Sequence, residues 1–200
     1  MAKQKDFNSF LSNIEPSPST VNYISSIQTT LRDYLKSHGT YKDAYYDSFL
    51  SGSYAKHTSI RPVSGENKRD VDIIIVTNYA KSKNSTDVIE ELCDVLKEKS
   101  DYKNVKKNSH SVSIEMGQVG VDVVPVIKHA INENLYYIGN YDDGLWALTD
   151  PKGHIEWSTT VNGDNSNEYK PLVKIMKWWR RENCPESHKY PKGITLEKIK

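Results

Sequence analysis

The chain has 200 residues, of which 36% are hydrophobic and 26% are charged, and its formal net charge is +1. This length allows one well-packed core, and the near-zero charge excludes a general electrostatic attraction to nucleic acid or membranes. Cys93 and Cys184 have no paired spacing and the histidines form no HxH or HExxH motif, so we expect neither a disulfide framework nor a zinc site. With no leader-like start and no apolar stretch approaching about 18 residues, we expect a cytoplasmic protein.

Two helices are expected at the N-terminus. The first is a short amphipathic segment over residues 1–16. Ser17 can cap the second helix, Pro18 suits its first position, and Gly39 follows its last turn. Apolar residues recur there at steps of three and four, which predicts a buried stripe made of Val21, Ile24, Ile27, Leu31 and Leu35.

The next segment predicts two strands on either side of a glycine turn. Residues 45–50 read as a strand that leads into a turn at Gly52 and Ser53, and residues 56–69 mix Pro, Gly, Ser and charge, as loops do. Residues 71–77 are a nearly continuous β-branched run, which predicts a strand buried on both faces.

The second half alternates helical and β-rich patterns. A helix is expected over 85–99, with an inward face made of Val88, Leu92, Val95 and Leu96. Four short strands should follow, over 105–116, 119–128, 134–139 and 144–150. The remaining segments are predicted to be a loop over 159–167, a helix over 168–183 with Leu172, Ile175, Met176 and Trp179 on one face, and the entry to another helix over 190–200. The pattern indicates an α/β or α+β core followed by the beginning of a helical segment.

Three aspartates lie at the heads of these strands. Asp70 and Asp72 are two residues apart, so a strand points both carboxylates to one face of the sheet. Asp122 is flanked by valines in a second strand-like run. Acidic groups held side by side repel each other and are tolerated where a hard divalent cation neutralises them. The three acids therefore predict a site for two Mg²⁺ (or Mn²⁺) ions.

A site of this kind performs two-metal phosphoryl chemistry. Asp70 and Asp72 would bridge both metals, and Asp122 would bind the metal on the nucleophile side and could take the proton of the attacking hydroxyl. Gly52 lets the backbone approach a phosphate, and the hydroxyl of Ser53 can donate to its oxygens. We interpret the chain as a nucleotidyltransferase.

Each of these features also has an ordinary structural alternative. A Gly-Ser pair alone is usually a turn, an Asp-x-Asp pair can be a solvated strand end, and a lone acid can be salt-bridged within a sheet. Lys177 could reach a triphosphate as a point charge, although its spacing alone favours a solvated helix lysine. Lys56, which flanks the active loop, is open to the same two interpretations.

The run GSYAKHTSIRPV…DVDIIIV, followed by VDVVPVI, resembles the polymerase-β-like nucleotidyltransferase superfamily. More closely, the chain is similar to the bacterial relatives of cyclic GMP–AMP synthase, the SMODS-type nucleotidyltransferases of antiphage signalling. Three later features support the closer resemblance: the segment from Asp150 to Trp157, the Lys-x-Trp pattern at Lys177 and Trp179, and the closing GITLEKIK.

The resemblance implies a mixed central sheet flanked by helices. Residues 1–165 would be the nucleotidyltransferase core, with the helix from Ser17 as its spine, and residues 166–200 only the beginning of a helical lobe. It also implies an enzyme that joins nucleoside triphosphates, ATP among them, into a cyclic di- or trinucleotide messenger. By motif match, Asp70, Asp72 and Asp122 would be the metal ligands, Gly52 and Ser53 the phosphate turn, and Lys177 a triphosphate contact; Lys56 is a further nucleotide-binding candidate. A protein activator is a candidate partner.

Two competing functions use the same features. A transferase that acts on RNA ends or on a small-molecule hydroxyl would need the same three acids, but the near-zero net charge and the lack of a basic stripe argue against a long nucleic acid substrate. A non-catalytic nucleotide-binding module would be expected to have lost at least one metal-binding acid, and all three are present.

Overall fold

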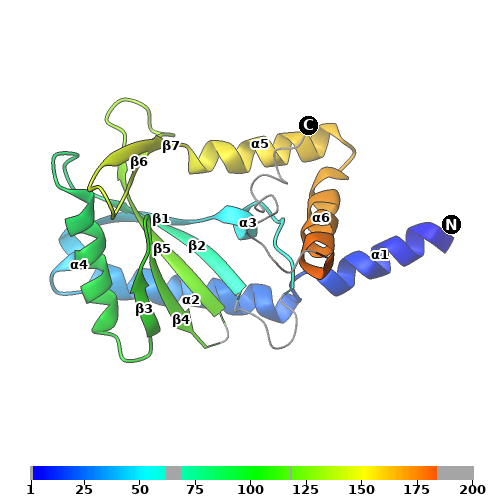
Figure 1. Ribbon diagram of the computed structural model, residues 1–200, viewed down its shortest axis with the longest axis horizontal. Coiled ribbons are helices and arrows are strands. Elements are labelled where there is room, and N and C mark those ends of the chain that lie inside the picture. The colour runs from blue at the N-terminus through cyan, green and yellow to red at the C-terminus, as the bar shows by residue number, and fades with distance from the viewer. Residues whose placement is uncertain (1, 62–68, 118, 184–200) are drawn as a thin grey trace.

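A mixed sheet flanked by helices forms the centre of the protein in the computed structural model, which describes residues 2–61, 69–117 and 119–183 (Figure 1). Within these residues the seven strands are β1 (Tyr45–Ser51), β2 (Arg69–Thr77), β3 (Lys103–Lys107), β4 (Val112–Met116), β5 (Val119–Lys128), β6 (Tyr136–Gly139) and β7 (Trp146–Thr149). The helices are α1 (Ala2–Ile14), α2 (Pro18–Ser37), α3 (Gly52–Ala55), α4 (Ser85–Lys97), α5 (Pro151–Asp164) and α6 (Tyr169–Asn183), with a 3₁₀ turn at Tyr41–Asp43.

The strand order is β1-β2-β5-β4-β3, and β5 also pairs with β6, which pairs with β7. Only the β2–β5 pair is parallel among the described strands, so the predicted mixed sheet with flanking helices is confirmed. Along its second edge β5 pairs first with β4 and then with β6, and Pro125 lies between the two paired segments. Proline has no N–H to donate, so this residue stands where the ladder on that edge is already interrupted.

The main core lies between one face of the sheet and helices α2 and α4. Ser17 caps α2 as predicted, and its Oγ accepts a hydrogen bond from the N–H of Thr20 at 3.3 Å. The apolar stripe predicted on α2 is buried except at Val21, which is 43% exposed. The neighbouring Thr20 is buried instead of Val21. The Thr20 hydroxyl is 2.8 Å from Ser17 Oγ, so the cap satisfies the polar atom that this burial removes from water.

Helix α4 presents the predicted inward face, with Val88, Leu92, Val95 and Leu96 all buried. Asn84 caps its start through Oδ1, which accepts from the N–H of Thr86 at 2.8 Å. None of the described helices combines the length and the apolarity needed to cross a membrane.

Two predictions for the second half are wrong. The single strand expected over 105–116 is two antiparallel strands, β3 and β4, because the polar run 108–111 turns the chain back. The loop expected over 159–167 is mostly helix: α5 extends to Asp164 although its sequence is rich in Thr, Asn and Gly. The sequence does mark the start of α5, because Asp followed by Pro is typical of a helix N-terminus. In the structure Asp150 accepts a capping hydrogen bond from the N–H of Gly153 at 2.7 Å, and Pro151 is at the first helical position.

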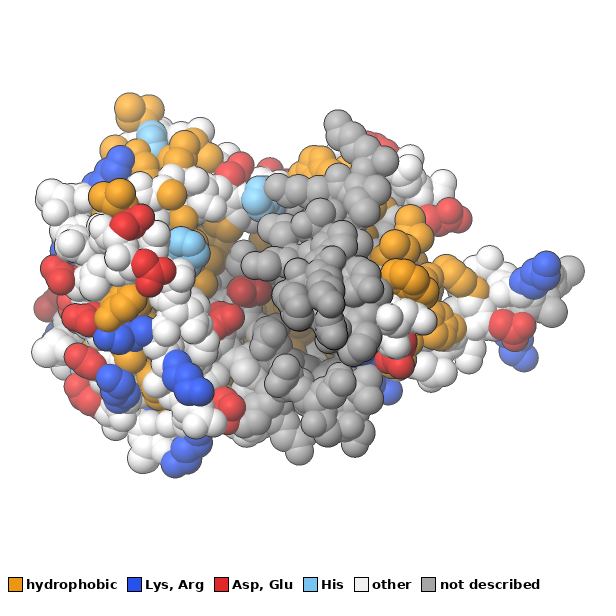
Figure 2. All heavy atoms as spheres, viewed as in Figure 1, with side chains coloured by type: hydrophobic (Ala, Val, Ile, Leu, Met, Phe, Trp, Pro, Cys, Tyr) orange, Lys and Arg blue, Asp and Glu red, His pale blue; other side chains and the backbone are white. Residues whose placement is uncertain are grey.

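The four residues predicted on one face of α6 differ in burial, since Ile175 and Met176 are partly buried. Leu172 and Trp179 are 57% and 54% exposed, and Val173 is the one buried residue of the helix. On the face drawn in Figure 2, apolar side chains gather where α1 meets α6. Part of this contact is an edge-to-face pair of Phe10 and Trp178, with ring centroids 6.3 Å apart. The helix entry expected over 190–200 lies outside the described residues.

The α2 stripe gives a direct test of the core. Leu31 is fully buried beneath the sheet, so we expect Leu31→Ala to lower the free energy of unfolding by about 2–5 kcal/mol through lost burial and a residual cavity. The matched control is Val21→Ala on the same helix, which should change it by about 0.5 kcal/mol or less because Val21 is largely exposed. Chemical denaturation would compare the two variants, and equal losses would contradict this assignment of the buried face.

Candidate functional site

Asp72 and Asp122 are direct neighbours on the two parallel strands. Asp72 on β2 lies opposite Asp122 on β5 in the register, so both side chains leave the same face of the sheet. Both residues are partly exposed, whereas the residues on either side of each are buried. Those flanking residues point into the core beneath α2 and α4, so the strand alternation turns the two acids to the opposite face.

The same face becomes apolar one step further along the strands. A second, smaller core cluster is formed there by Ile74, Val76, Val124, Val126 and Tyr136. The two carboxylates therefore stand at the edge of a packed surface, where solvent and ligands can reach them. A like-charged pair in such a place needs a cation or several hydrogen-bond donors.

Asp70 precedes Asp72 by two residues on β2 and pairs in register with Gly120. The Asp70 side chain lies outside the described atoms, so the prediction that it shares a face with Asp72 stays a prediction. Among the described side chains, no group of three His, Cys, Asp or Glu residues lies together. The three-acid site consequently stays a prediction, with two of its members adjacent.

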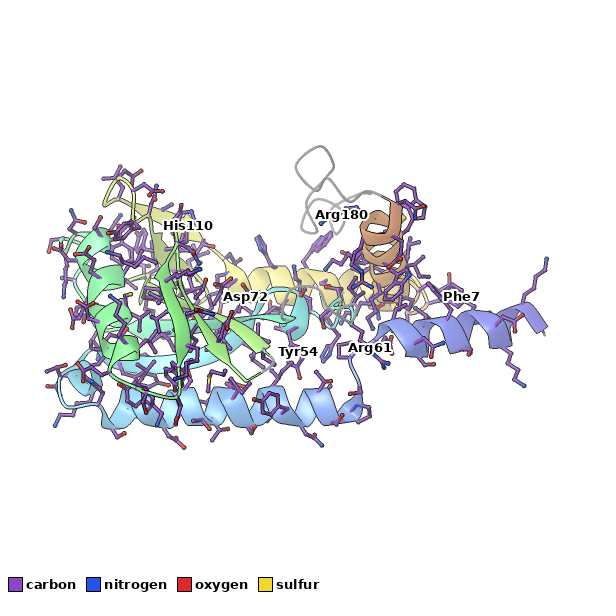
Figure 3. All side chains as sticks on the ribbon, turned by 60° about the horizontal axis from the view of Figure 1, so that its bottom comes forward. Phe7, Tyr54, Arg61, Asp72, His110 and Arg180 are labelled. Atoms are coloured by element: carbon purple, nitrogen blue, oxygen red, sulfur yellow. The ribbon has the colours of Figure 1, made fainter. Side chains whose placement is uncertain are left out.

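Gly52 lies directly against Asp72. Its φ is +62°, and a Cβ built on it would fall 1.7 Å from Oδ2 of Asp72, so only glycine fits (Figure 3 shows Asp72 beside α3). A turn was expected at Gly52 and Ser53. In the structure these two residues begin the short helix α3. Ser51 pairs with Asp72 in the β1–β2 register, which explains why the end of β1 delivers Gly52 to the carboxylate.

The segment after α3 links Ser53 to Lys177. The N–H of Thr58 donates to the carbonyl of Ser53 at 2.9 Å, and Thr58 is completely buried. From α6, the Lys177 ammonium donates to both the carbonyl and the hydroxyl oxygen of Thr58, each at 3.2 Å. Lys177 is thus not a solvated helix lysine. Lys56 ends α3 through its N–H, which donates to the carbonyl of Gly52 at 3.2 Å.

A basic face of α6 was missed at the sequence level. Lys170, Lys174, Lys177 and Arg181 follow helical spacing, which was the available signal. Lys174 pairs with Glu15 at 2.7 Å, and Arg181 donates to the carbonyl of Arg61 at 2.6 Å. Figure 3 shows Arg61 in the junction between α1 and α6.

Burial and neighbouring lysines lower the pKa values of two basic groups beside this helix. The pKa of Lys170 is lowered first by burial and then by the nearby Lys174. The pKa of His57 is also lowered, first by burial and then by Lys170 and Lys174. Both shifts follow mainly from burial, and the neighbouring lysines are the second cause.

The donor set fits a divalent metal. Asp72 and Asp122 supply hard carboxylate oxygens from one face, as Mg²⁺ and Mn²⁺ prefer, and Gly52 keeps the space beside Asp72 free of a side chain. Oδ1 of Asp122 is held by hydrogen-bond donors, the shortest being the hydroxyl of Ser113 at 2.6 Å. The sequence analysis did not identify this hydroxyl.

Comparison with known proteins places this geometry in a family. Residues 1–162 match the Second Messenger Oligonucleotide or Dinucleotide Synthetase (SMODS) domain. The chain belongs to the SMODS family. A cyclic AMP-AMP-AMP synthase from an Acinetobacter species is 40% identical in an alignment of 200 positions, which covers 98% of this chain and 57% of that protein. A cyclic AMP-AMP-GMP synthase from Enterobacter hormaechei is 26% identical over 257 residues, which cover all of this chain and 67% of that protein.

Solved structures share the fold at low sequence identity. The CD-NTase CdnG of Bradyrhizobium diazoefficiens, solved in complex with GTP, matches 96% of this chain and 67% of its own with a TM-score of 0.79 and 12% identity. The DncV cyclic AMP-GMP synthase of Vibrio cholerae was solved with a linear intermediate. Its match covers 94% of this chain and 68% of its own, with a TM-score of 0.76 and 13% identity. The predicted resemblance to SMODS-type nucleotidyltransferases is confirmed. The chain spans 57% of the length of its Acinetobacter relative.

The contact of Gly52 with Asp72 can be tested by adding one methyl group. We expect Gly52→Ala to cost roughly 1–2 kcal/mol of stability for the left-handed backbone and to weaken binding of Mn²⁺ with a non-hydrolysable ATP analogue about tenfold or more, because the carboxylate must move. Calorimetric titration would measure the binding. The control is Gly39→Ala, since an added Cβ there meets nothing within 4 Å. Equal affinities in the two variants would show that the close approach of Gly52 is unnecessary.

Proposed function

We propose that this chain is the catalytic core of a metal-dependent nucleotidyltransferase that joins nucleoside triphosphates into a cyclic oligonucleotide second messenger. The observation that carries the proposal is the pairing of Asp72 with Asp122 beside Gly52. Membership of the SMODS family supports it, because this family is named for the synthesis of such messengers. Asp70, Asp72 and Asp122 are the proposed metal ligands.

When bound, two Mg²⁺ or Mn²⁺ ions would lower the pKa of an attacking sugar hydroxyl and neutralise charge on the α-phosphate and the departing pyrophosphate. Asp70 and Asp72 would hold both ions, and Asp122 would hold the ion on the side of the nucleophile. Oδ2 of Asp122 would receive the hydroxyl proton as the new oxygen–phosphorus bond forms and the bond to pyrophosphate breaks. In-line attack then depends on positioning, which the rigid strands supply.

The residues around α3 would bind the triphosphate. Gly52 and Ser53 would offer backbone and hydroxyl donors to phosphate oxygens, and Lys177 would add a positive charge from α6. The hydrogen bonds from Lys177 to Thr58 support this role, because they hold the ammonium beside the segment that begins at Gly52. Lys56 is proposed as a further contact from the end of α3.

For the product, we propose a cyclic trinucleotide made from ATP. The support is the 40% identity to a cyclic AMP-AMP-AMP synthase over nearly the whole chain. We further propose that the core extends to residue 165, in the link between α5 and α6, and that α6 begins the helical lobe. The expected protein activator, the cytoplasmic location and a role in antiphage signalling stay predictions.

Removing the charge of one metal ligand tests the reaction. We expect Asp72→Asn to lower turnover by at least about a hundredfold, because metal stabilisation of the transition state is worth several kcal/mol, while the thermal unfolding curve stays cooperative. The assay incubates the protein with α-labelled triphosphates and Mg²⁺, treats the mixture with phosphatase and resolves the resistant products. Asp101→Asn, an exposed acid in the turn before β3, is the control. Wild-type turnover in Asp72→Asn would refute the site.

Lys177 separates nucleotide binding from helix docking. We expect Lys177→Ala to raise the KM for ATP about tenfold, the loss of one charge-assisted hydrogen bond, with a smaller change in kcat. The comparison variant is Lys174→Ala, which removes the ion pair with Glu15 from the same helix face and should act mainly on stability. An unchanged KM in Lys177→Ala would mean that this lysine only docks α6 onto Thr58.

A further inference from the structure

Three polar side chains converge on one oxygen of Asp122. Oδ1 accepts hydrogen bonds from the hydroxyl of Ser113 at 2.6 Å, the hydroxyl of Ser111 at 3.4 Å and the side-chain amide of Asn108 at 3.4 Å. Ser113 lies directly opposite Asp122 in the β4–β5 register, so its side chain shares the face of the carboxylate. Asn108 and Ser111 come from the turn between β3 and β4.

The direction of these hydrogen bonds is determined by chemistry. The amide nitrogen of Asn108 can only donate, and its two hydrogens are shared among Oγ of Ser113, Oγ of Ser111 at 3.1 Å and Oδ1 of Asp122 at 3.4 Å. Ser113 therefore uses a lone pair toward Asn108 and has its single hydroxyl hydrogen left for Asp122. The result is a directed chain from Asn108 through Ser113 to Oδ1, and no described residue donates to Oδ2.

The turn that supplies Asn108 and Ser111 is itself anchored. The N–H of Asn108 donates to the carbonyl of Ser111 at 2.8 Å, which closes the turn. The N–H of Tyr141 donates to the carbonyl of Ser109 at 2.7 Å, and Nδ1 of His110 is 2.7 Å from the carbonyl of Gly139. The position of the turn is thus tied to the end of β6, and Figure 3 shows His110 on this side of the sheet.

We propose that Asn108, Ser111 and Ser113 form a carboxylate clamp that holds Asp122 in one rotamer, with Oδ1 occupied and Oδ2 presented to the metal and the attacking hydroxyl. These are positioning residues, because they contact Asp122 and not the reacting atoms. The effect of the clamp on catalysis rests on the proposed function. Its effect on the orientation of the Asp122 carboxylate rests on the hydrogen bonds alone. Partners of this type fix the orientation of metal ligands, and losing one typically costs about 10–100-fold in metal affinity or activity.

The clamp predicts a specific set of defects in Ser113→Ala. We expect Mn²⁺ affinity, measured by calorimetry in the presence of a non-hydrolysable ATP analogue, to fall about tenfold, and kcat to fall by a similar factor with little change in KM for ATP. Ser113→Thr keeps the hydroxyl and suits a strand, so it should restore most of both quantities. The matched control is Ser109→Ala in the same turn, because its hydroxyl donates to Asp142 at 2.8 Å and not to Asp122.

The two readouts distinguish the clamp from the proposed reaction. If the wild-type chain binds Mn²⁺ but forms no product, the proposed function fails, and the clamp is judged by the metal affinities of the Ser113 variants. The clamp is overturned if Ser113→Ala and Ser109→Ala bind Mn²⁺ equally, or if Ser113→Thr is as defective as Ser113→Ala. Absence of Mn²⁺ binding by the wild-type chain would overturn both proposals.

Discussion

The parallel register between β2 and β5 is the constraint on which the site depends. It sets Asp72 beside Asp122 at the spacing of neighbouring strands, about 4.8 Å, on one face of the sheet. The opposite face is held by the core beneath α2 and α4. Because side chains alternate with period two, a slip of one residue in either strand would send a carboxylate into that core. The burial that stabilises the fold therefore also enforces the pairing of the two acids.

The surroundings of the two carboxylates differ. Gly52 brings backbone against Asp72, where a side chain would collide with the carboxylate. The β3–β4 turn brings hydroxyl and amide donors to Asp122. Neither contact depends on apolar burial. The site is formed by the close backbone of Gly52 and by hydrogen bonds to Asp122, at the edge of a packed sheet. A divalent ion would supply the remaining neutralisation.

Helix α6 is positioned by a different kind of contact. Lys177 and Arg181 donate to carbonyl oxygens of the chain between α3 and β2, and Lys174 pairs with Glu15 at the end of α1. Because these bonds dock α6 through polar groups, the apolar side chains of Leu172 and Trp179 are left exposed. Polar docking places a row of basic groups beside the segment that begins at Gly52, where a triphosphate would need positive charge.

Much of the fold could be predicted because periodicity reports burial directly. The α2 and α4 faces and the strands β1, β2 and β5 follow patterns of apolar residues, and Asp72 and Asp122 stand out as charges within such patterns. The helix α5 was missed because Thr, Asn and Gly weaken the helical pattern, leaving only the cap at Asp150 as a signal. The docking of α6 could not be predicted because Lys177 and Arg181 donate to backbone carbonyls, which every residue carries and no sequence pattern marks.

The residues that could do the chemistry are visible in the amino-acid order alone: three aspartates in strand-like runs, a Gly-Ser pair after a strand, and a lysine on a late helix. They are visible there because strand periodicity and the chemistry of carboxylates are local properties. Only the tertiary structure decided that Asp72 meets Asp122, that Gly52 must be glycine, and that Ser113 holds the third acid. Strand order and register join residues far apart in the chain, and they are decided by the packing of the whole core rather than by any one segment.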